Sequence, residues 1–268
     1  MFKNFKQIKR KFRPKKEKPY VPDMRTKPGA VATLARRLAP RTPNVPLIRL
    51  GPAVDGGYVV PDDIDGVSAC ISPGVSTECG FDLALAERGI DIYMADASVD
   101  GPPLAHPRFH FAKKFLGPLT RGSDVNIAEF CNEIPNFAGG GDLILQMDIE
   151  GAEYPVLLGM SQQLLARFRI IILELHGLEM VGDMSGHAIL QALTDKLLAQ
   201  HTVVHVHPNN FGGTVVVQGI PVPRVLELTL LRNDRTTFTR DLARNFPDPL
   251  DAENAPFLPP LILPEAWR

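Results

Sequence analysis

The fold of this chain is decided by the stretch from Gly139 to Glu153, which reads Gly-Gly-Gly-Asp-Leu-Ile-Leu-Gln-Met-Asp-Ile-Glu-Gly-Ala-Glu. After the triple glycine, Leu143 to Met147 form an apolar run of strand length, and the acids Asp148 and Glu150 follow at once. Ligands bind at the carboxyl ends of strands in open α/β sheets, so both acids are candidates for chemistry. The alternative is that Asp148 caps the next helix and Glu150 is merely solvated.

Similar apolar runs recur on both sides of this stretch and alternate with helical patterns. This alternation is typical of an open α/β domain with a largely parallel sheet. An Asp55-Gly-Gly turn signal also predicts a hairpin ahead of the main sheet. The predicted strands of the sheet are 67–72, 90–95, 108–115, 143–147, 168–176, 202–207 and 224–232, and the predicted helices are 30–38, 81–88, 126–133, 152–159 and 186–200.

The charge of the chain is unevenly distributed. Of 268 residues, 44% are hydrophobic and 22% charged, which is ordinary for a globular protein. The formal net charge is -1, but residues 1–28 hold 11 of the 29 Lys and Arg and only two acids. This arm therefore carries +9 and the remainder about -10. An acidic body argues against a nucleic-acid enzyme with a basic active face.

We expect a basic arm at 1–28 and a single domain at 29–268 that ends in a proline-rich tail. Phe2, Phe5, Ile8 and Phe12 lie near helical spacing among basic residues, so the arm could bind an anionic membrane surface as an amphipathic helix. The alternative is a disordered, solvated tail, which its four prolines favour. The sequence leaves the oligomeric state open.

The sequence predicts a cytoplasmic protein, and the basic arm adds the expectation of peripheral contact with the inner face of the membrane. Its three cysteines show no Cys-x-x-Cys spacing, which is typical of a reducing compartment without a disulfide framework. No apolar run reaches the roughly 18 residues that a membrane span requires. The basic start of the chain has no apolar segment behind it, so it does not resemble a secretory signal.

A nucleotide-type ligand is indicated at the first predicted strand. Ser72 ends that strand, Gly74 follows in the turn, and a helical pattern comes next, an arrangement that brings backbone N–H groups close to a ligand. Asp96 ends the next strand, about 20 residues on, where an acid accepts hydrogen bonds from ribose hydroxyls. The alternative for Asp96 is a loop or cap residue.

Acids and histidines also follow the later strands. Period two places Glu174 and His176 on one face at the end of 168–176, and His205 and His207 likewise at the end of 202–207. Such groups suit Mg²⁺ or Mn²⁺, for which the predicted ligands are Asp148, Glu174 and His207. Without a metal they could act as general base and substrate partners, and the predicted catalytic residues are Asp148, Glu150 and His176.

With these residues in view, the chain resembles the FkbM-like family of S-adenosylmethionine-dependent methyltransferases. Gln146-Met-Asp-Ile-Glu-Gly-Ala-Glu153 looks like the family's Lys-Ile-Asp-(Ile/Val)-Glu-Gly-Ala-Glu block. The Asp55-Gly-Gly-Tyr58 turn and the segment Phe81 to Gly89 are also similar. The resemblance runs from about Leu47 to Arg232, and the arm and tail lie outside it.

This resemblance implies a Rossmann-like methyltransferase fold, with a seven-stranded, mostly parallel sheet whose last strand is antiparallel and with helices on both faces. It also implies methyl transfer from S-adenosylmethionine to a hydroxyl of a sugar, glycan or other small natural product. Ser72, Gly74, Asp96 and Asp148 then correspond to cofactor-binding positions. The chain departs from the family pattern in its first turn, where Ser72-Pro-Gly-Val-Ser has one glycine instead of two or three.

Two other functions are compatible with the sequence. The first is a divalent-metal-dependent enzyme of another class, which would use the Asp, Glu and His residues at the strand ends without a methyl donor. The second is a non-catalytic binding module that keeps the fold and recruits a glycan-assembly complex through its basic arm. Binding of S-adenosylmethionine, metal content and turnover distinguish the three.

Overall fold

The computed structural model describes residues 25–27, 29–75, 77–135, 137, 140–239 and 245–268. Nearly all of the basic arm lies outside these residues, so its helical and membrane-binding character stays a prediction. The described end of the arm is held by Thr26, whose Oγ1 donates a hydrogen bond to Val181 O at 2.6 Å. Across the described part of the chain, no helix combines the length and apolarity that crossing a membrane requires.

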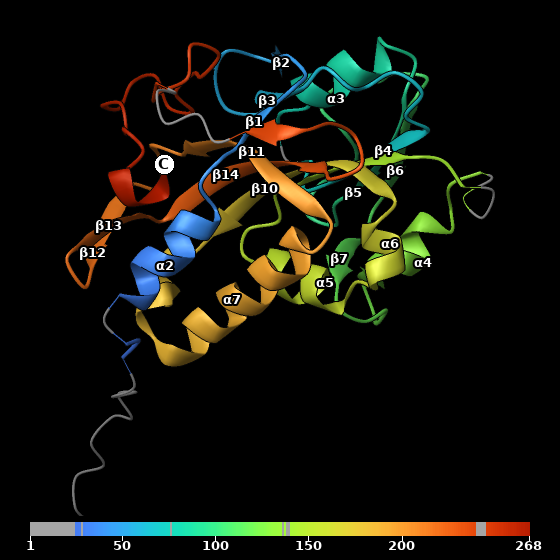
Figure 1. The fold of residues 1–268 in the computed structure, drawn as a ribbon. Coiled ribbons are helices and arrows are strands. Elements are labelled where there is room, and N and C mark those ends of the chain that lie inside the picture. The colour runs from blue at the N-terminus through green and yellow to red at the C-terminus, as the bar shows by residue number, and fades with distance from the viewer. Residues whose placement is uncertain (1–24, 28, 76, 136, 138–139, 240–244) are drawn as a thin grey trace, which may run out of the picture.

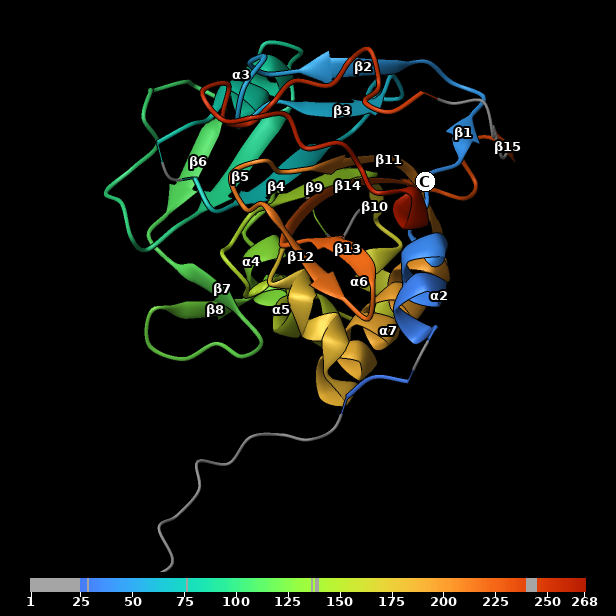
Figure 2. The same ribbon diagram turned by 90° about the vertical axis from the view of Figure 1, so that its left-hand side faces the viewer.

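Seven strands form the central sheet (Figures 1 and 2): β4 (Ala69–Pro73), β5 (Asp91–Ala95), β6 (Phe109–Ala112), β9 (Leu143–Met147), β10 (Phe168–His176), β11 (His201–Pro208) and β14 (Val225–Arg232). Their order is β11-β14-β10-β9-β4-β5-β6. The five strands from β10 to β6 are parallel, whereas β14 is antiparallel to both β10 and β11. This α/β sheet confirms the expected Rossmann-like fold, and the ranges predicted for β9 and β10 are confirmed to the residue.

The strand order reverses between β4 and β9. From β4 the chain proceeds outward through β5 and β6, and then returns to add β9 and β10 on the other side. A crevice opens beyond the carboxyl ends of strands at such a reversal. Gly74 and Asp148 follow the two strands there, and a Cβ on Gly74 would lie only 1.6 Å from Asp148 O. A glycine is therefore required at this crossing.

One face of the sheet is covered by helices α2 (Ala30–Arg37), α4 (Ile127–Cys131), α5 (Glu153–Gly159), α6 (Gln162–Leu165) and α7 (Met184–Leu198), as Figure 1 shows. The apolar spacing that predicted a helix at 186–200 corresponds to α7. Leu190, Leu193 and Leu197 of this helix are all buried in the core. At the start of α4 the Asn126 side chain accepts a hydrogen bond from Ala128 N at 2.9 Å.

The opposite face is built differently from the expectation of helices on both faces. Among the described residues its only α-helix is α3 (Gly80–Ala86), and the antiparallel pair β2 (Leu47–Leu50) and β3 (Tyr58–Pro61) covers the rest. Residues 96–108, between β5 and β6, form turns and bends where a second helix would lie. The predicted Asp55-Gly-Gly turn lies in the loop that joins β2 to β3.

Short elements and the tail complete the domain: β1 (Thr42–Pro43) pairs with β15 (Phe238–Thr239), β7 (Phe115–Gly117) with β8 (Asp124–Asn126), and β12 (Thr214–Val217) with β13 (Ile220–Pro223), while η2 (Leu178–Gly182) and η3 (Glu265–Trp267) are single turns. Trp267 anchors the tail, since it is buried and its Nε1 donates to Pro221 O at 3.1 Å. Phe257 of the same tail is instead 80% exposed.

Candidate functional site

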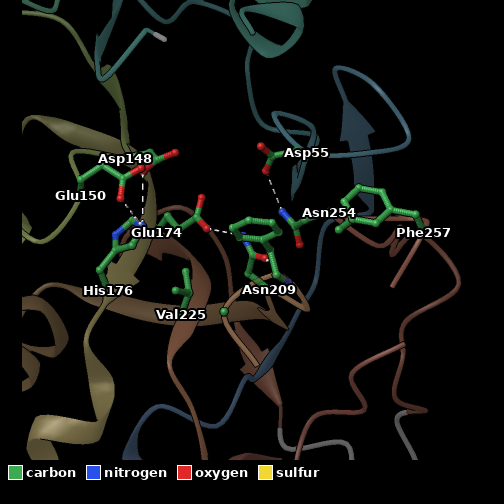
Figure 3. Close-up of a pocket in the computed structure, with 12 residues that line it drawn as sticks. Asp55, Asp148, Glu150, Glu174, His176, Asn209, Val225, Asn254 and Phe257 are labelled. Carbon is green, nitrogen blue, oxygen red and sulfur yellow. Dashed lines mark hydrogen bonds and ion pairs between the residues drawn. The ribbon is translucent and has the colours of Figure 1, made fainter. Parts of the chain in front are cut away.

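Asp148, Glu150 and His176 meet beyond the carboxyl ends of β9 and β10 (Figure 3). Nε2 of His176 lies 3.8 Å from Asp148 Oδ1 and 3.6 Å from Glu150 Oε2. The parallel register places the ends of the two strands side by side, with Met147 opposite Leu173. The structure thus brings together the three side chains that the sequence predicted to be catalytic.

Glu153, in the first turn of α5, holds the imidazole from the other side. Its Oε1 lies 3.1 Å from His176 Nδ1 and also accepts hydrogen bonds from Ile149 N at 3.0 Å and Gly151 N at 3.1 Å. Because this oxygen is an acceptor, the Nδ1–H of His176 donates to it. His176 therefore turns Nε2 toward Asp148 and Glu150. The His176 carbonyl in turn accepts from Tyr154 Oη at 2.7 Å.

The loop that carries Glu150 has an unusual backbone. Glu150 has φ 55°, in the left-handed region, and Gly151 follows with φ 98°. Residues other than glycine, asparagine and aspartate are uncommon in that region, and holding one there costs on the order of 1–3 kcal/mol of conformational energy. The hydrogen bonds from Ile149 and Gly151 to Glu153 hold this loop in place.

Burial changes the acid–base properties of this cluster. It raises the pKa of Asp148 to about 6, although the neighbouring His176 works in the opposite direction. For His176, burial disfavours the charged imidazolium, but the hydrogen bond to Glu153 and the nearby carboxylates outweigh it, and the His176 pKa is raised. The carboxyl group of Asp148 therefore titrates nearer neutrality than an exposed carboxylate does, as a proton-transfer group requires.

Glu174 stands one pleat before His176 on the same face of β10. Burial, together with the carboxyl groups of Asp148 and Glu227, raises the pKa of Glu174 to about 10. Its carboxyl group is therefore protonated at neutral pH. Asn209, just after β11, donates to Glu174 Oε1 at 2.5 Å.

Two cavities open beside this cluster and share Asp148 and Glu150. The first, of about 570 Å³, extends toward the ends of β4 and β5 and is lined by Gly74, Asp96, Ser98, Phe115, Pro118, Ile149 and other residues of these loops. Asp96 is 6% exposed, and its Oδ1 accepts from Ser98 N at 2.7 Å and Ser98 Oγ at 2.6 Å. This volume is in the range of cavities that hold a cofactor or drug-sized ligand.

The second cavity, of about 460 Å³, lies on the His176 side (Figure 3). Its lining comes from the β2–β3 loop, the ends of β10 and β11, the start of β14 and the tail. Besides Asp148 and Glu150, it is lined by Asp55, Glu174, His176, Asn209, Phe211, Gly212, Val225, Asn254, Ala255 and Phe257. A cluster of proton-transfer groups thus separates two ligand-sized spaces.

The family model of the methyltransferase FkbM domain matches residues 120–199, the segment that carries Asp148, Glu150 and His176. The match supports an FkbM-like methyltransferase. It spans β9, β10 and the helices between them, whereas Gly74 and Asp96 lie before it. Among curated proteins, no significant match to the chain was found.

Two predicted ligands lie away from the cluster of Asp148, Glu150 and His176. Ser72 is 2% exposed and donates from Oγ to Gln146 Oε1 at 2.8 Å, and it does not line the first cavity. His207 lies on β11, and β14 separates it from Glu174, with Glu227 opposite both residues in the cross-strand register. The insertion of β14 at this point is what the sequence pattern did not show.

The predicted metal ligands Asp148, Glu174 and His207 are therefore not brought together. His207 Nδ1 lies instead 3.5 Å from Asp251 Oδ1 in the tail. Among the described residues, the His, Cys, Asp and Glu group whose ligand atoms all lie within 4.8 Å of one another is Asp148, Glu150 and His176. These three are therefore the candidate ligands for a cation at this edge of the sheet.

Three residues of the site were missed or given another role. Glu153 ends the stretch from Gly139 to Glu153, but an acidic residue at the start of a helix is common and indicates no special role. Asp55 was interpreted as a turn residue, and Asn254 lies in a tail without periodicity. The structure joins these two, with Asn254 Nδ2 donating to Asp55 Oδ1 at 3.0 Å.

Proposed function

We propose that this chain is an S-adenosylmethionine-dependent O-methyltransferase acting on a hydroxyl of a sugar, glycan or other small natural product. The observation that carries the proposal is the placement of two ligand-sized cavities that share only Asp148 and Glu150. A transferase must hold donor and acceptor on two sides of one reacting point. His176, held by a buried carboxylate, lines the acceptor side only.

The residues of the first cavity fit the donor. Gly74 lines this cavity in the turn after β4, and Asp96 offers a carboxylate at the end of β5 that would accept hydrogen bonds from ribose hydroxyls. When bound, S-adenosylmethionine supplies a methyl group on a positively charged sulfur, so that the sulfur leaves as a neutral thioether. Asp148 and Glu150, at the boundary between the cavities, favour a positive charge at that position.

His176 is the proposed general base. In its neutral form Nδ1–H donates to Glu153, and the free Nε2 accepts the proton of the acceptor hydroxyl as its oxygen forms the new bond to the methyl carbon. The electron pair of the broken carbon–sulfur bond goes to sulfur, and the proton ends on His176 Nε2. Glu153 stabilises the imidazolium that forms, as a carboxylate does in a hydrolase triad.

A divalent cation is a further part of this proposal. Asp148, Glu150 and His176 offer two carboxylates and an imidazole, a donor set that Mn²⁺ accepts and that Mg²⁺ accepts with added water. An ion there would polarise the acceptor hydroxyl and lower its pKa. With the ion bound, His176 and Asp148 would be ligands rather than bases, and solvent would take the proton.

Calorimetric titration of S-adenosylmethionine and S-adenosylhomocysteine, with and without Mg²⁺ or Mn²⁺, tests the proposal. We expect micromolar binding of both, and tighter binding with metal if the ion sits beside the donor. H176A and D148A should each lose about 10²- to 10⁴-fold in turnover while remaining folded. Full activity in both variants would contradict the assignment of the base.

The second candidate function is a divalent-metal-dependent enzyme of another class, favoured by the grouping of Asp148, Glu150 and His176. Tight uptake of Mn²⁺ without binding of either donor compound would support it over the methyltransferase. The two candidate functions therefore predict opposite results for donor binding in the same titration.

The site of action is also a proposal. We expect the protein in the cytoplasm, with residues 1–28 contacting an anionic membrane surface that carries a lipid-linked glycan acceptor. Vesicles with and without phosphatidylserine, mixed with the full chain and with a chain lacking residues 1–28, test this. Equal binding of the two chains would remove the membrane role of the arm.

A further inference from the structure

The acceptor-side cavity is rich in hydrogen-bond acceptors. Four carboxyl groups line it, and no Lys or Arg of the described part of the chain is among its lining residues. His176 is the single lining side chain of the described residues that can carry a positive charge, and its two ring nitrogens already face Glu153, Asp148 and Glu150. Arg49, on β2, does not line the cavity and donates hydrogen bonds to the backbone oxygens of Pro52, Val54 and Leu250.

Asn254 supplies an unsatisfied acceptor in this cavity. Its Nδ2 donates to Asp55 Oδ1 at 3.0 Å and to Glu227 Oε1 at 2.6 Å (Figure 3 shows the first of these). The two carboxylates fix the orientation of the amide, because the carbonyl end could not donate to them. Oδ1 of Asn254, a residue only 9% exposed, is then left without a hydrogen-bond partner among the described residues. A buried unsatisfied acceptor requires a donor, which an ordered water or a ligand supplies.

The other polar groups of the cavity follow the same pattern. Oδ1 of Asp148 is also buried without a hydrogen-bond partner among the described residues. One N–H of Asn209 Nδ2 donates to Glu174, while its Oδ1 accepts from Phe211 N at 2.8 Å. The two amides thus donate to the protein's own carboxyl groups, and Asn254 and Asp148 of the cavity lining each keep an oxygen atom without a partner of the described chain.

Two aromatic side chains stand at the cavity with their rings exposed. Phe211 is 73% and Phe257 80% exposed, and both line the same space. Large exposed aromatic side chains in a polar cavity are typical of a binding site rather than of a folded core. Their faces can pack on the C–H groups of a sugar ring and attract a cation.

We propose that the acceptor is a polyhydroxylated ring that carries a protonated amino group, as in an amino sugar or aminocyclitol. The inference rests on the proposed methyltransferase function and specifies its substrate class. The ammonium lies against the carboxylate of Asp55 and the Oδ1 of Asn254, and the ring packs on Phe257. The hydroxyl to be methylated faces His176. Anionic acceptors, such as uronates or sugar phosphates, are repelled by the carboxylates.

The proposed acceptor class is tested by calorimetry. Matched methyl glycosides are titrated into the full chain saturated with S-adenosylhomocysteine. The gluco, galacto and manno series are each used as the 2-amino-2-deoxy sugar, the neutral 2-hydroxy sugar and the uronate. We expect the best amino sugar to bind about tenfold more tightly than its neutral match, the gain of a charged over a neutral hydrogen bond. This preference should shrink at high salt. The uronates should bind most weakly.

Matched variants separate charge from packing. D55N should reduce the preference for the amino sugar to about threefold or less, whereas D62N, an exposed acid beyond β3 that does not line the cavity, should keep it. F257A should weaken the amino and neutral sugars alike, and I262A, an exposed residue of the same tail outside the cavity, should change neither.

The proposal is overturned if the neutral sugars or uronates bind as tightly as the amino sugars, or if none of the nine glycosides binds. Such a result leaves the methyltransferase assignment standing as long as S-adenosylhomocysteine binds in the first step. Failure of that first step contradicts the assignment itself. The two failures are therefore distinguishable within one experiment.

Discussion

The buried Glu153 pairs with the partly buried His176, and Oε1 of the carboxylate lies 3.1 Å from Nδ1 of the imidazole. The same oxygen accepts the N–H groups of Ile149 and Gly151, which flank Glu150. One carboxylate therefore orients the base and holds the loop at the boundary of the two cavities. Glu153 is completely buried, so it acts on the reaction through His176 as a positioning residue.

E153Q should lower kcat by about 10²-fold and change the acceptor KM little. The amide can still accept a hydrogen bond, but it no longer stabilises the imidazolium that forms when His176 takes the proton. Because the carboxylate raises the His176 pKa, the rising limb of the pH–rate profile should move to lower pH in the variant. Steady-state kinetics across pH measure both effects.

The control for this variant is E87Q, which removes an exposed carboxylate at the end of α3. It should leave kcat and the pH profile unchanged. A wild-type pH profile in E153Q would show that Glu153 only supports the fold.

Glu174 makes the folded state lose stability as pH rises. Its pKa is 4.5 in the unfolded chain and about 10 in the folded protein, so between these values the folded state binds more protons. Its stabilising contribution is complete below about pH 4.5 and lost as pH approaches 10. The expected slope is at most about 1.4 kcal/mol per pH unit, since Asp148 and Glu227 share the titration.

E174Q should flatten this decline, because glutamine keeps the shape and stays neutral. Urea unfolding between pH 5 and 9 gives the free energy of unfolding for both proteins. At pH 5 the two should differ little, and the wild type should fall progressively behind the variant as the pH rises through 7 toward 9. Parallel curves over the whole range would contradict the raised pKa.

Much of this site could be predicted from the sequence because each strand is recognisable from its own apolar run. Asp148 and His176 each end an apolar run of strand length, and parallel strands bring such ends to one edge. The identity of the third partner, Glu150, followed from the same block. The periodicity of a strand is a local property, so these positions needed no knowledge of the tertiary fold.

The remaining contacts depend on tertiary structure. The apolar pattern of β14 does not predict whether this strand lies at the edge of the sheet or between β10 and β11. Its position between them is the reason that His207 lies away from Asp148. The contact of Asp55 with Asn254 joins a loop and a tail that both lack periodicity. The interaction of Glu153 with His176 requires the angle at which α5 leaves the sheet.

Gly74 should tolerate no side chain, because a Cβ there would overlap a neighbouring atom and because its φ is positive. Alanine substitutions at Gly66 and Gly101 distinguish these two causes. In G74A the new Cβ meets Asp148 O at 1.6 Å and the residue keeps φ 89°, so we expect a loss of more than about 2 kcal/mol. Gly66 has φ 76° with open space around it, so G66A should lose about 1 kcal/mol from the backbone alone. G101A, with neither feature, should be neutral.

Urea unfolding measures these three free energies, and titration of S-adenosylhomocysteine measures the effect on the donor cavity. G74A should also weaken that binding, since Asp148 must shift. Equal stability of G74A and G66A would mean that the crossing of the two strand ends is looser than the structure shows.

Asp96 should contribute to donor affinity and not to the chemical step. Its carboxylate lines the first cavity at the end of β5, away from His176, and D96N keeps an oxygen for the N–H and hydroxyl of Ser98. Replacing charged by neutral hydrogen bonds to the ribose should weaken binding of S-adenosylhomocysteine by about 10- to 100-fold. With saturating donor, kcat should stay close to wild type. D100N, a fully exposed acid nearby that pairs with Lys113, serves as the control and should bind normally. A fall in kcat without a change in affinity would instead place Asp96 in the chemistry and remove it from the ribose site.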